Sequence, residues 1–322
     1  MRFVVYGAGA VGGVLGGRLH QHGHDVVLIA RGAHHDAMRE RGLRLQSPDD
    51  DVVLDVPVVA SPAALEFRED DVVLLGVKSQ DTFAAAQSLV GQASSSTPVV
   101  SLQNGVANEP VLLRWFANVY GICVMAPTAH VEPGIVQAQS APISGLMDIG
   151  RYPDGVDGTA RNIASALSSS TFESEPRPDI MRWKYTKLLM NLGNAVDATC
   201  AQDDAARDLA RTARREGVAA LDATGIPRAS EEENRQRRGE RLTVRPIDGA
   251  FRGGGSTWQS LARSTGTIEV DYLNGEIVLL GRRHALPTPV NALLCEVAND
   301  MARNHAPPRS ASAADLLALL PG

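Results

Sequence analysis

The first twelve residues carry the feature that most constrains the fold. A short β-favouring run, Arg2–Tyr6, leads directly into the glycine-rich string Gly7-Ala-Gly-Ala-Val-Gly12, and a helical pattern follows as far as His22. The spacing G-x-G-x-x-G is a weak signal alone, but between a strand and a helix it is typical of a dinucleotide-binding turn. The chain is therefore expected to begin with a strand–helix–strand unit, the building block of a parallel sheet.

Each glycine of the string has an expected role. Gly7 permits the tight turn, Gly9 lets the backbone approach a pyrophosphate, and Gly12 allows close packing of helix and strand. The following helix would offer free N–H groups and its positive dipole end to the phosphates. The predicted cofactor-binding backbone consists of Gly7, Ala8, Gly9, Ala10, Val11 and Gly12.

The end of the second predicted strand indicates which dinucleotide is bound. NAD sites usually carry Asp or Glu there, where it binds the ribose 2′-hydroxyl. After Val26–Ile29 this chain instead has Ala30, Arg31 and Gly32, with no acidic residue. Because a guanidinium can pair with a 2′-phosphate, Arg31 favours NADP(H) over NAD(H).

The remaining pattern predicts two domains. Strands are expected at 58–59, 71–77 and 98–102, with mixed strands over 120–149 that close the sheet, and helices at 81–91 and through Phe116. After a linker at 173–178, helices are expected from 179 onward, at 203–225, 267–286 and 290–305, with a solvated charged helix face or loop at 231–241. The predicted fold class is α/β: an N-terminal Rossmann doubly wound sheet (1–172), followed by an all-α C-terminal domain (173–322).

Composition excludes several classes of partner. The net charge is −6 with a pI near 5.8, so no basic excess favours nucleic acid or an acidic membrane surface. No apolar run reaches the roughly 18–20 residues that cross a bilayer, and we expect a cytoplasmic protein. Cys123, Cys200 and Cys295 show no C-x-x-C spacing, and the eight histidines show no metal-ligand spacing, so neither a disulfide framework nor a metal is expected.

Polar side chains follow two predicted strands directly. Lys78 comes after the strand that ends at Val77, and Gln103 and Asn104 come after the strand that ends at Leu102. Open α/β sheets bind ligands at the carboxyl ends of their strands, so these groups are expected to face the nicotinamide.

A second polar group lies in the helical half. At about 100° per residue, Lys187, Asn191 and Asn194 would share one face of a single helix. Asn and a lone Lys are poor choices for the interior of an otherwise apolar helix. We therefore expect this face to line a cleft.

In these and other motifs the chain resembles the ketopantoate reductase (2-dehydropantoate 2-reductase) family. The resemblance spans nearly the whole sequence and its motifs occur in the family's order. They are GAGAVGG at the start, Arg31, VKSQDT around Lys78, SLQNG around Asn104, APTAHVEPG, the KLLMN run and IEVDYLNGE. It implies a Rossmann domain, a helical domain and an active site between them.

The resemblance also implies roles for individual residues. Lys187 and Asn191 match the family's catalytic lysine and the asparagine four residues later, so Lys184 ranks below Lys187 as the catalytic lysine. Glu269 matches the family's glutamate, which contacts substrate and cofactor, and Ser256 matches its substrate-binding serine, with a competing interpretation of Ser256 as a helix N-cap. On the cofactor side the matches are Lys78 and Asn104, the latter also a candidate substrate ligand.

Three departures put the substrate in doubt. The family usually has a second asparagine eight residues after the lysine, where this chain has Ala195; Asn194, one position earlier, is the candidate replacement. Ser260 stands where an acidic residue is common, and one residue is inserted before Glu269.

The predicted function is NADPH-dependent reduction of 2-dehydropantoate to pantoate, a step of pantothenate and coenzyme A biosynthesis. Protonated Lys187 would supply the proton, while the cofactor supplies hydride. A reductase of another small 2-keto acid and a non-catalytic NADP(H)-binding sensor are the alternatives, and the sequence does not decide between a monomer and a homodimer.

Overall fold

The fold is taken from a computed structural model, in which residues 1–251, 253–264 and 266–320 are described. The chain divides into two compact units. The first comprises Met1–Asn104, Asn108–Trp183 and Glu231–Arg252, and the second comprises Gly105–Ala107, Lys184–Ser230 and Gly253–Gly322.

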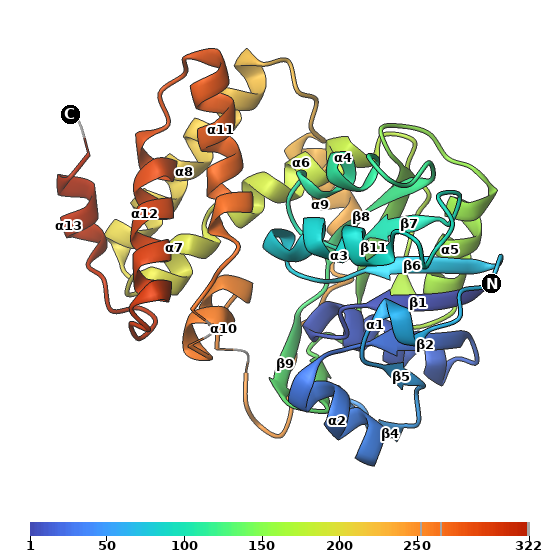
Figure 1. Ribbon diagram of the computed structural model, residues 1–322. Helices are drawn as coiled ribbons and strands as arrows, with labels where there is room; N and C mark the ends of the chain where they lie inside the picture. Colours follow the sequence, from blue (N-terminus) through green and yellow to red (C-terminus); the bar gives the residue numbers. More distant parts are fainter. Residues whose placement is uncertain (252, 265, 321–322) are drawn as a thin grey trace. The chain divides into compact units, whose positions relative to one another are not determined.

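The first unit is built on an eight-stranded sheet (Figure 1). Its order is β12-β11-β8-β7-β6-β1-β2-β5, and every neighbouring pair is parallel except β8 and β11. The chain therefore winds outward from β1 in both directions, as a doubly wound sheet requires. The strands are β1 (Arg2–Tyr6), β2 (Asp25–Ile29), β5 (Val58–Val59), β6 (Asp71–Leu75), β7 (Val99–Ser101), β8 (Val119–Met125), β11 (Gly145–Arg151) and β12 (Phe172–Glu173).

Alternate residues of each strand enter separate cores, because successive side chains point to opposite faces of a sheet. Phe3 and Val5 pack with α1 (Ala10–Gln21) and α5 (Gly158–Ser168), whereas Val4 packs with α3 (Thr82–Leu89) and the segment around α4 (Asn108–Leu112). Both faces of the sheet are thus covered, which explains why its strands are apolar throughout. The sequence prediction of a Rossmann domain is confirmed.

A second, four-stranded sheet covers the outer side of α1. Its order is β4-β3-β10-β9, with β3 (Leu43–Gln46), β4 (Asp51–Leu54), β9 (Thr128–Glu132) and β10 (Ile135–Ala138). Strands β3 and β4 were not predicted, and the prediction that the strands of 120–149 all close the main sheet is wrong for β9 and β10.

Glycines let α1 fit between the two sheets. A Cβ at Gly16 would be 2.6 Å from Leu28 of the main sheet, and a Cβ at Gly17 would be 2.8 Å from Leu45 of the second sheet. Gly12 and Gly13, four residues earlier, are close to Val5 and Val136 in the same way. Two glycine rows on opposite sides of one helix therefore bring both sheets close to its backbone.

The segment expected to be a linker belongs to the first unit instead. Glu173 lies in edge strand β12, and the Ser174 hydroxyl donates to the Met147 carbonyl over 2.6 Å. Pro176 and Pro178 disfavour helix, but the intervening backbone still pairs: Arg177 N donates to the Ile149 carbonyl at 2.7 Å.

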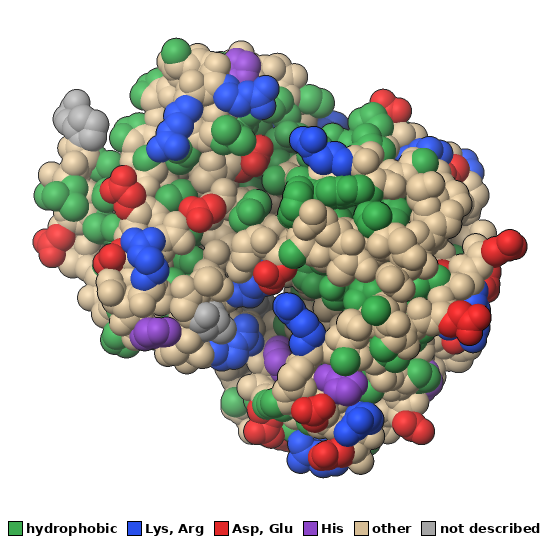
Figure 2. Space-filling model, viewed as in Figure 1, with side chains coloured by type: hydrophobic (Ala, Val, Ile, Leu, Met, Phe, Trp, Pro, Cys, Tyr) green, Lys and Arg blue, Asp and Glu red, His purple; other side chains and the backbone are tan. Residues whose placement is uncertain are grey.

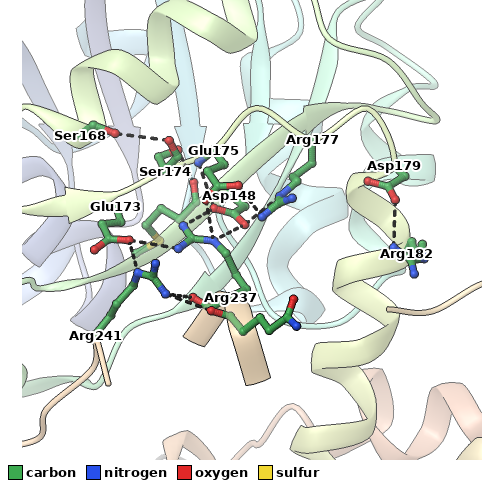
Figure 3. Close-up of polar contacts among 12 residues, drawn as sticks. Asp148, Ser168, Glu173, Ser174, Glu175, Arg177, Asp179, Arg182, Arg237 and Arg241 are labelled. Atoms are coloured by element: carbon green, nitrogen blue, oxygen red, sulfur yellow. Dashed lines mark hydrogen bonds and ion pairs between the residues drawn. The ribbon is translucent and has the colours of Figure 1, made fainter. Parts of the chain in front are cut away.

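The charged run 231–241 also packs against the first unit (Figure 3). It forms α9 (Glu231–Arg238), and most of its side chains are exposed, as expected for a solvated helix face. Arg237 differs: it is 6% exposed and forms two hydrogen bonds to Asp148 of β11. Around this pair Arg177 also contacts Asp148, and Arg241 contacts Glu173. The run is therefore an anchored helix with one buried cation.

Helices make up the second unit and the segment leading into it. They are α6 (Ile180–Asn191), α7 (Asn194–Thr199), α8 (Asp204–Ala223), α10 (Ser256–Ala262), η3 (Val270–Tyr272), α11 (Asn274–His284), α12 (Pro289–Arg303) and α13 (Ala313–Ala318). The predicted helix at 267–286 begins only at Asn274, because residues 270–272 form a separate 3₁₀ turn. The remaining elements of the first unit are α2 (Gly32–Arg41), η1 (Pro62–Ala64) and η2 (Ser79–Asp81).

Surface charge is mixed on the face drawn in Figure 2, where basic and acidic side chains alternate instead of forming one basic patch. Within the described residues, none of the helices combines the length and the apolar character needed to cross a bilayer.

Candidate functional site

The glycine turn has the shape that a pyrophosphate requires. Gly7 has a φ of +101°, and a Cβ there would be 2.6 Å from Val77 N, so only glycine fits. A Cβ at Gly12 would collide with the Gly7 carbonyl oxygen. A Cβ at Gly9 would meet nothing within 4 Å. The space beside Gly9 is therefore open, and a phosphate could approach its backbone directly.

The helix that follows is oriented for an anion. Gly9 is the N-cap of α1, and no side chain caps this helix end. No acidic residue lies in its first turn, and Ala10 and Val11 are partly exposed there. Uncapped N–H groups and the helix dipole favour negative charge at this position.

Arg31 lies in the turn between β2 and α2, just as the glycine turn lies between β1 and α1. It is the exposed N-cap residue of α2, two residues after the end of β2. Across the described part of the chain, no carboxylate forms an ion pair with its guanidinium. The side chain can therefore reach a ligand phosphate without breaking a salt bridge.

A buried amide fixes the ends of β6 and β7 relative to each other. Gln103 is 4% exposed, and its Nε2 donates to the Val77 carbonyl at 2.9 Å and to Thr82 Oγ1 at 2.8 Å. Gln103 was predicted to face the nicotinamide, but its amide points into the protein instead.

Asn108 links the two predicted cofactor-side residues. Its Nδ2 donates to the Asn104 carbonyl at 3.2 Å and to Ser79 Oγ at 3.3 Å, and its Oδ1 accepts from Thr82 Oγ1 at 2.8 Å. One buried side chain therefore contacts the backbone of Asn104 and the hydroxyl of Ser79, the residue after Lys78. Sequence reasoning missed Asn108, because its partners lie up to 29 residues away.

In the second unit, Lys187 and Asn191 lie one turn apart in α6. Lys187 is partly exposed, whereas Asn191 is 4% exposed. The competing lysine, Lys184, is only 2% exposed. Of the two lysines, Lys187 is therefore the more accessible to a small molecule.

Asn194 is not on the same helix, so the prediction of one continuous polar face is wrong. Helix α6 ends at Asn191, and α7 begins at Asn194 after Gly193. The Leu192 carbonyl accepts from Asn274 Nδ2 at 3.0 Å. Glycine has a low helix propensity, and the buried Asn274 side chain donates to the Leu192 carbonyl between the two helices.

Asn194 instead lies beside the start of α10. A Cβ at Gly255 would be 3.6 Å from Asn194 Oδ1, and Gly255 N donates to Asp197 Oδ2 at 3.1 Å. Ser256 follows as the first residue of α10; the N-cap position belongs to Gly255, not to Ser256. The Ser256 hydroxyl is therefore not used as an N-cap.

Glu269 lies just before η3 and is partly exposed. Its carbonyl accepts from Tyr272 N at 3.0 Å, and its carboxylate does not cap the turn. The backbone of Glu269 therefore has the structural role, while the carboxylate is not needed to start η3.

Family models match most of this chain. Residues 3–154 match the model described as ketopantoate reductase PanE/ApbA, and residues 179–302 match its C-terminal counterpart. This chain belongs to the ketopantoate reductase family. Members of the family are NAD(P)H-dependent oxidoreductases that act on a CH–OH group.

Individual relatives align over nearly their full length. The 2-dehydropantoate 2-reductase of Halobacterium salinarum is 31% identical over 312 residues, which cover 92% of this chain and 97% of the relative. The 2-dehydropantoate 2-reductase of Pyrococcus abyssi is 28% identical, and the alignment covers 91% of this chain and 95% of the relative.

Solved structures share the fold. The PanE/ApbA family ketopantoate reductase from Ralstonia eutropha has a TM-score of 0.79 at 28% identity, covering 95% of this chain and 99% of that one. A ternary structure of D-mandelate dehydrogenase with NADH and anilino(oxo)acetate has a TM-score of 0.81 at 23% identity, covering 95% and 100%. At that identity the likeness shows the fold alone.

Two of the positions at which the sequence departs from the expected family pattern are buried. Ala195 is 1% exposed, so the position of the family's second asparagine is in the core here. Ser260 is 3% exposed and its hydroxyl donates to the Ser256 carbonyl at 3.1 Å within α10. Neither position presents a polar side chain to solvent in this chain.

Proposed function

We propose that this chain reduces 2-dehydropantoate to pantoate with NADPH, a step of pantothenate and coenzyme A biosynthesis. The observation that carries the proposal is the pairing of accessible Lys187 with Asn191 one turn later, in a member of the ketopantoate reductase family. Most of the proposed cofactor groups belong to the first unit, and most of the proposed substrate groups belong to the second.

The cofactor, when bound, supplies hydride to the keto carbon, and the keto oxygen must then gain a proton. Protonated Lys187 donates this proton and stabilises the negative charge that develops on the oxygen. Asn191, one turn later in α6, orients the ammonium group or the substrate.

The other groups recognise the substrate. Ser256 binds the carboxylate of the substrate, and Asn194, next to the start of α10, also contacts the substrate. Glu269 accepts a hydrogen bond from the substrate hydroxyl. Asn104 holds the substrate or the cofactor ribose, and Lys78 binds on the cofactor side. Glu269 is also proposed as a contact of the cofactor, as the resemblance to the family implies.

The test is NADPH oxidation, followed by absorbance, with 2-dehydropantoate as substrate. Lys187→Ala should lower kcat roughly 10²–10⁴-fold while NADPH binding is kept. Arg211→Ala, an exposed substitution in α8, is the control and should leave kcat unchanged. Normal kcat in Lys187→Ala, or a loss found only in Lys184→Ala, would remove Lys187 from the mechanism.

NADPH is the preferred cofactor in this proposal because Arg31 is exposed at the end of β2, where no acidic residue stands. Fluorescence titration should show tighter binding of NADPH than of NADH, and Arg31→Ala should remove the difference. Equal affinities in the unmodified protein would contradict the assignment.

A second candidate is reduction of a different 2-keto acid. The observation that favours it is that Ala195 and Ser260 stand where the family resemblance leads us to expect an asparagine and an acidic residue. A panel of 2-dehydropantoate, the aryl keto acid corresponding to mandelate, and short aliphatic 2-keto acids separates the candidates by kcat/KM.

A further inference from the structure

A histidine outside the predicted site contacts the glycine turn. His34 lies in the first turn of α2, and its Nε2 is 2.7 Å from the Ala8 carbonyl oxygen. Its other ring nitrogen, Nδ1, is 2.8 Å from the backbone N of Gly134, in the turn between β9 and β10. One side chain thus links the glycine turn of the main sheet to a turn of the second sheet.

These two contacts fix the protonation state of the ring. A backbone N–H can only donate, so Nδ1 must accept from Gly134 and carry no proton. A carbonyl can only accept, so Nε2 must carry the proton that it donates to Ala8. Burial lowers the pKa of His34 below its usual value, although the bond to Ala8 opposes this change. The neutral Nε2-protonated form is therefore the one that fits this site.

The bond to Ala8 sets the direction of the next peptide group. In a trans peptide the C=O and N–H point in opposite directions. With the Ala8 carbonyl held by His34, the Gly9 N–H is turned away from α2. Ala8 is 2% exposed, whereas the space beside Gly9 is open, so this N–H belongs to the part of the turn that a phosphate can approach.

The same ring also holds the start of α2. Arg31, the N-cap residue of this helix, is three residues before His34. On the other side, Gly134 packs on α2: a Cβ at Gly134 would be 3.1 Å from the Ala37 Cβ. The His130 ring of β9 also lies 4.2 Å from the His34 ring. His34 is thus enclosed by the glycine turn, by β9 and by the β9–β10 turn.

We infer that His34 is a positioning residue for the dinucleotide: it orients the Ala8–Gly9 peptide toward the pyrophosphate and fixes α2, which carries Arg31, against the glycine turn. The inference rests on the proposed function only in assuming that the turn binds a dinucleotide. It does not depend on which keto acid is reduced.

The experiment compares NADPH binding in three variants, measured by fluorescence titration without any keto acid. His34→Ala removes both hydrogen bonds and should raise the Kd about tenfold, with little change in kcat at saturating NADPH. In His34→Gln the side-chain amide offers one donor and one acceptor, so this variant should recover most of the affinity. His35→Ala, the control, changes a neighbouring histidine whose only described ring contact is Asp36, and its Kd should stay unchanged.

The inference is overturned if His34→Ala binds NADPH with the same Kd as the unmodified protein. It is also overturned if His34→Gln and His34→Ala have equal thermal stability and His34→Gln does not bind NADPH more tightly. If neither variant folds, ¹⁵N-histidine NMR of the unmodified protein decides: an Nδ1-protonated or charged His34 at neutral pH overturns the inference, and the Nε2-protonated form supports it.

The same titration separates this inference from the proposed function. A protein that binds NADPH but reduces no keto acid contradicts the reductase proposal alone. A protein that binds neither dinucleotide contradicts both.

Discussion

Arg237 and Asp148 form a buried bidentate ion pair between α9 and β11. Arg237 Nη2 and Nε donate to the two Asp148 oxygens at 2.6 and 2.9 Å, although 89 residues separate the partners in sequence (Figure 3). Both side chains are about 95% buried. This pair holds residues 231–251 on the first unit, although the chain on either side belongs to the second unit.

Arg237→Ala should strongly destabilise the first unit. The substitution leaves the Asp148 carboxylate buried without its main partner, and losses of this kind cost about 3–5 kcal/mol. Urea unfolding measures the change. Arg235→Ala, on the exposed side of α9, should cost no more than about 1 kcal/mol, because the Glu232–Arg235 pair is solvated. Equal effects of the two substitutions would show that the buried pair contributes no special stability.

Asn108→Asp should impair folding as well as cofactor or substrate binding, because residue 108 is buried and the new carboxylate would lose its hydration there. The new carboxylate can still accept from Thr82, but it cannot donate to Asn104 or Ser79 and would repel the Asn104 carbonyl. We expect kcat/KM to fall about tenfold or more, since each lost buried hydrogen bond costs about 1–3 kcal/mol. Asn118→Asp, at a surface turn, is the control, and its kcat/KM should match that of the unmodified protein.

The part of the site that could be predicted from sequence depends on local geometry. The glycine turn follows from three glycines at fixed spacing after a strand, and Gly7, Gly9 and Gly12 each have the surroundings that this spacing implies. Arg31 and Lys78 were likewise placed by their position after a strand. In each case the neighbours in sequence determine where the residue lies.

The errors arise where distant residues decide the local structure. Helix α6 stops before Asn194 where the Asn274 side chain, 82 residues from its partner, binds the Leu192 carbonyl. The charged run 231–241 resembles a solvated surface, and only Asp148 makes Arg237 a buried residue. Gln103 resembles a ligand-facing amide until its inward bonds to Val77 and Thr82 are known. None of these partners can be identified from one sequence.

The stability contributed by Asp157 should depend on pH. Asp157 caps α5: its Oδ1 accepts from Ala160 N, and its Oδ2 accepts from Tyr120 OH at 2.7 Å. Burial raises the pKa of this carboxyl, but the hydrogen bonds and the charge of Arg151 together lower it by more than burial raises it. The pKa of Asp157 therefore lies below its usual value. A folded pKa below the unfolded one gives stability that is present above the unfolded value and is lost as pH falls.

Asp157→Asn keeps an acceptor but removes the charge. The free energy of unfolding should be lower in the variant by up to about 1 kcal/mol at pH 7. The gap should close as the pH falls below about 4, where the wild-type carboxyl becomes protonated. Urea unfolding at several pH values measures it, with exposed Asp154→Asn as the control that shows no gap. A gap that stays constant between pH 7 and pH 3 would show that the charge contributes nothing.

Gly9→Ala and Gly12→Ala should separate cofactor binding from folding. Gly9 has an ordinary φ of −71° and open space around a Cβ, so alanine fits the folded protein. The added methyl group would occupy the position that a phosphate needs, and Gly9→Ala should lose NADPH affinity by tenfold or more at an unchanged Tm. A Cβ at residue 12 collides with the Gly7 carbonyl, so Gly12→Ala should lower the Tm as well. Thermal unfolding and fluorescence titration measure the two effects. If Gly9→Ala binds NADPH normally, the pyrophosphate does not approach the turn at Gly9, and the position assigned to the cofactor is wrong.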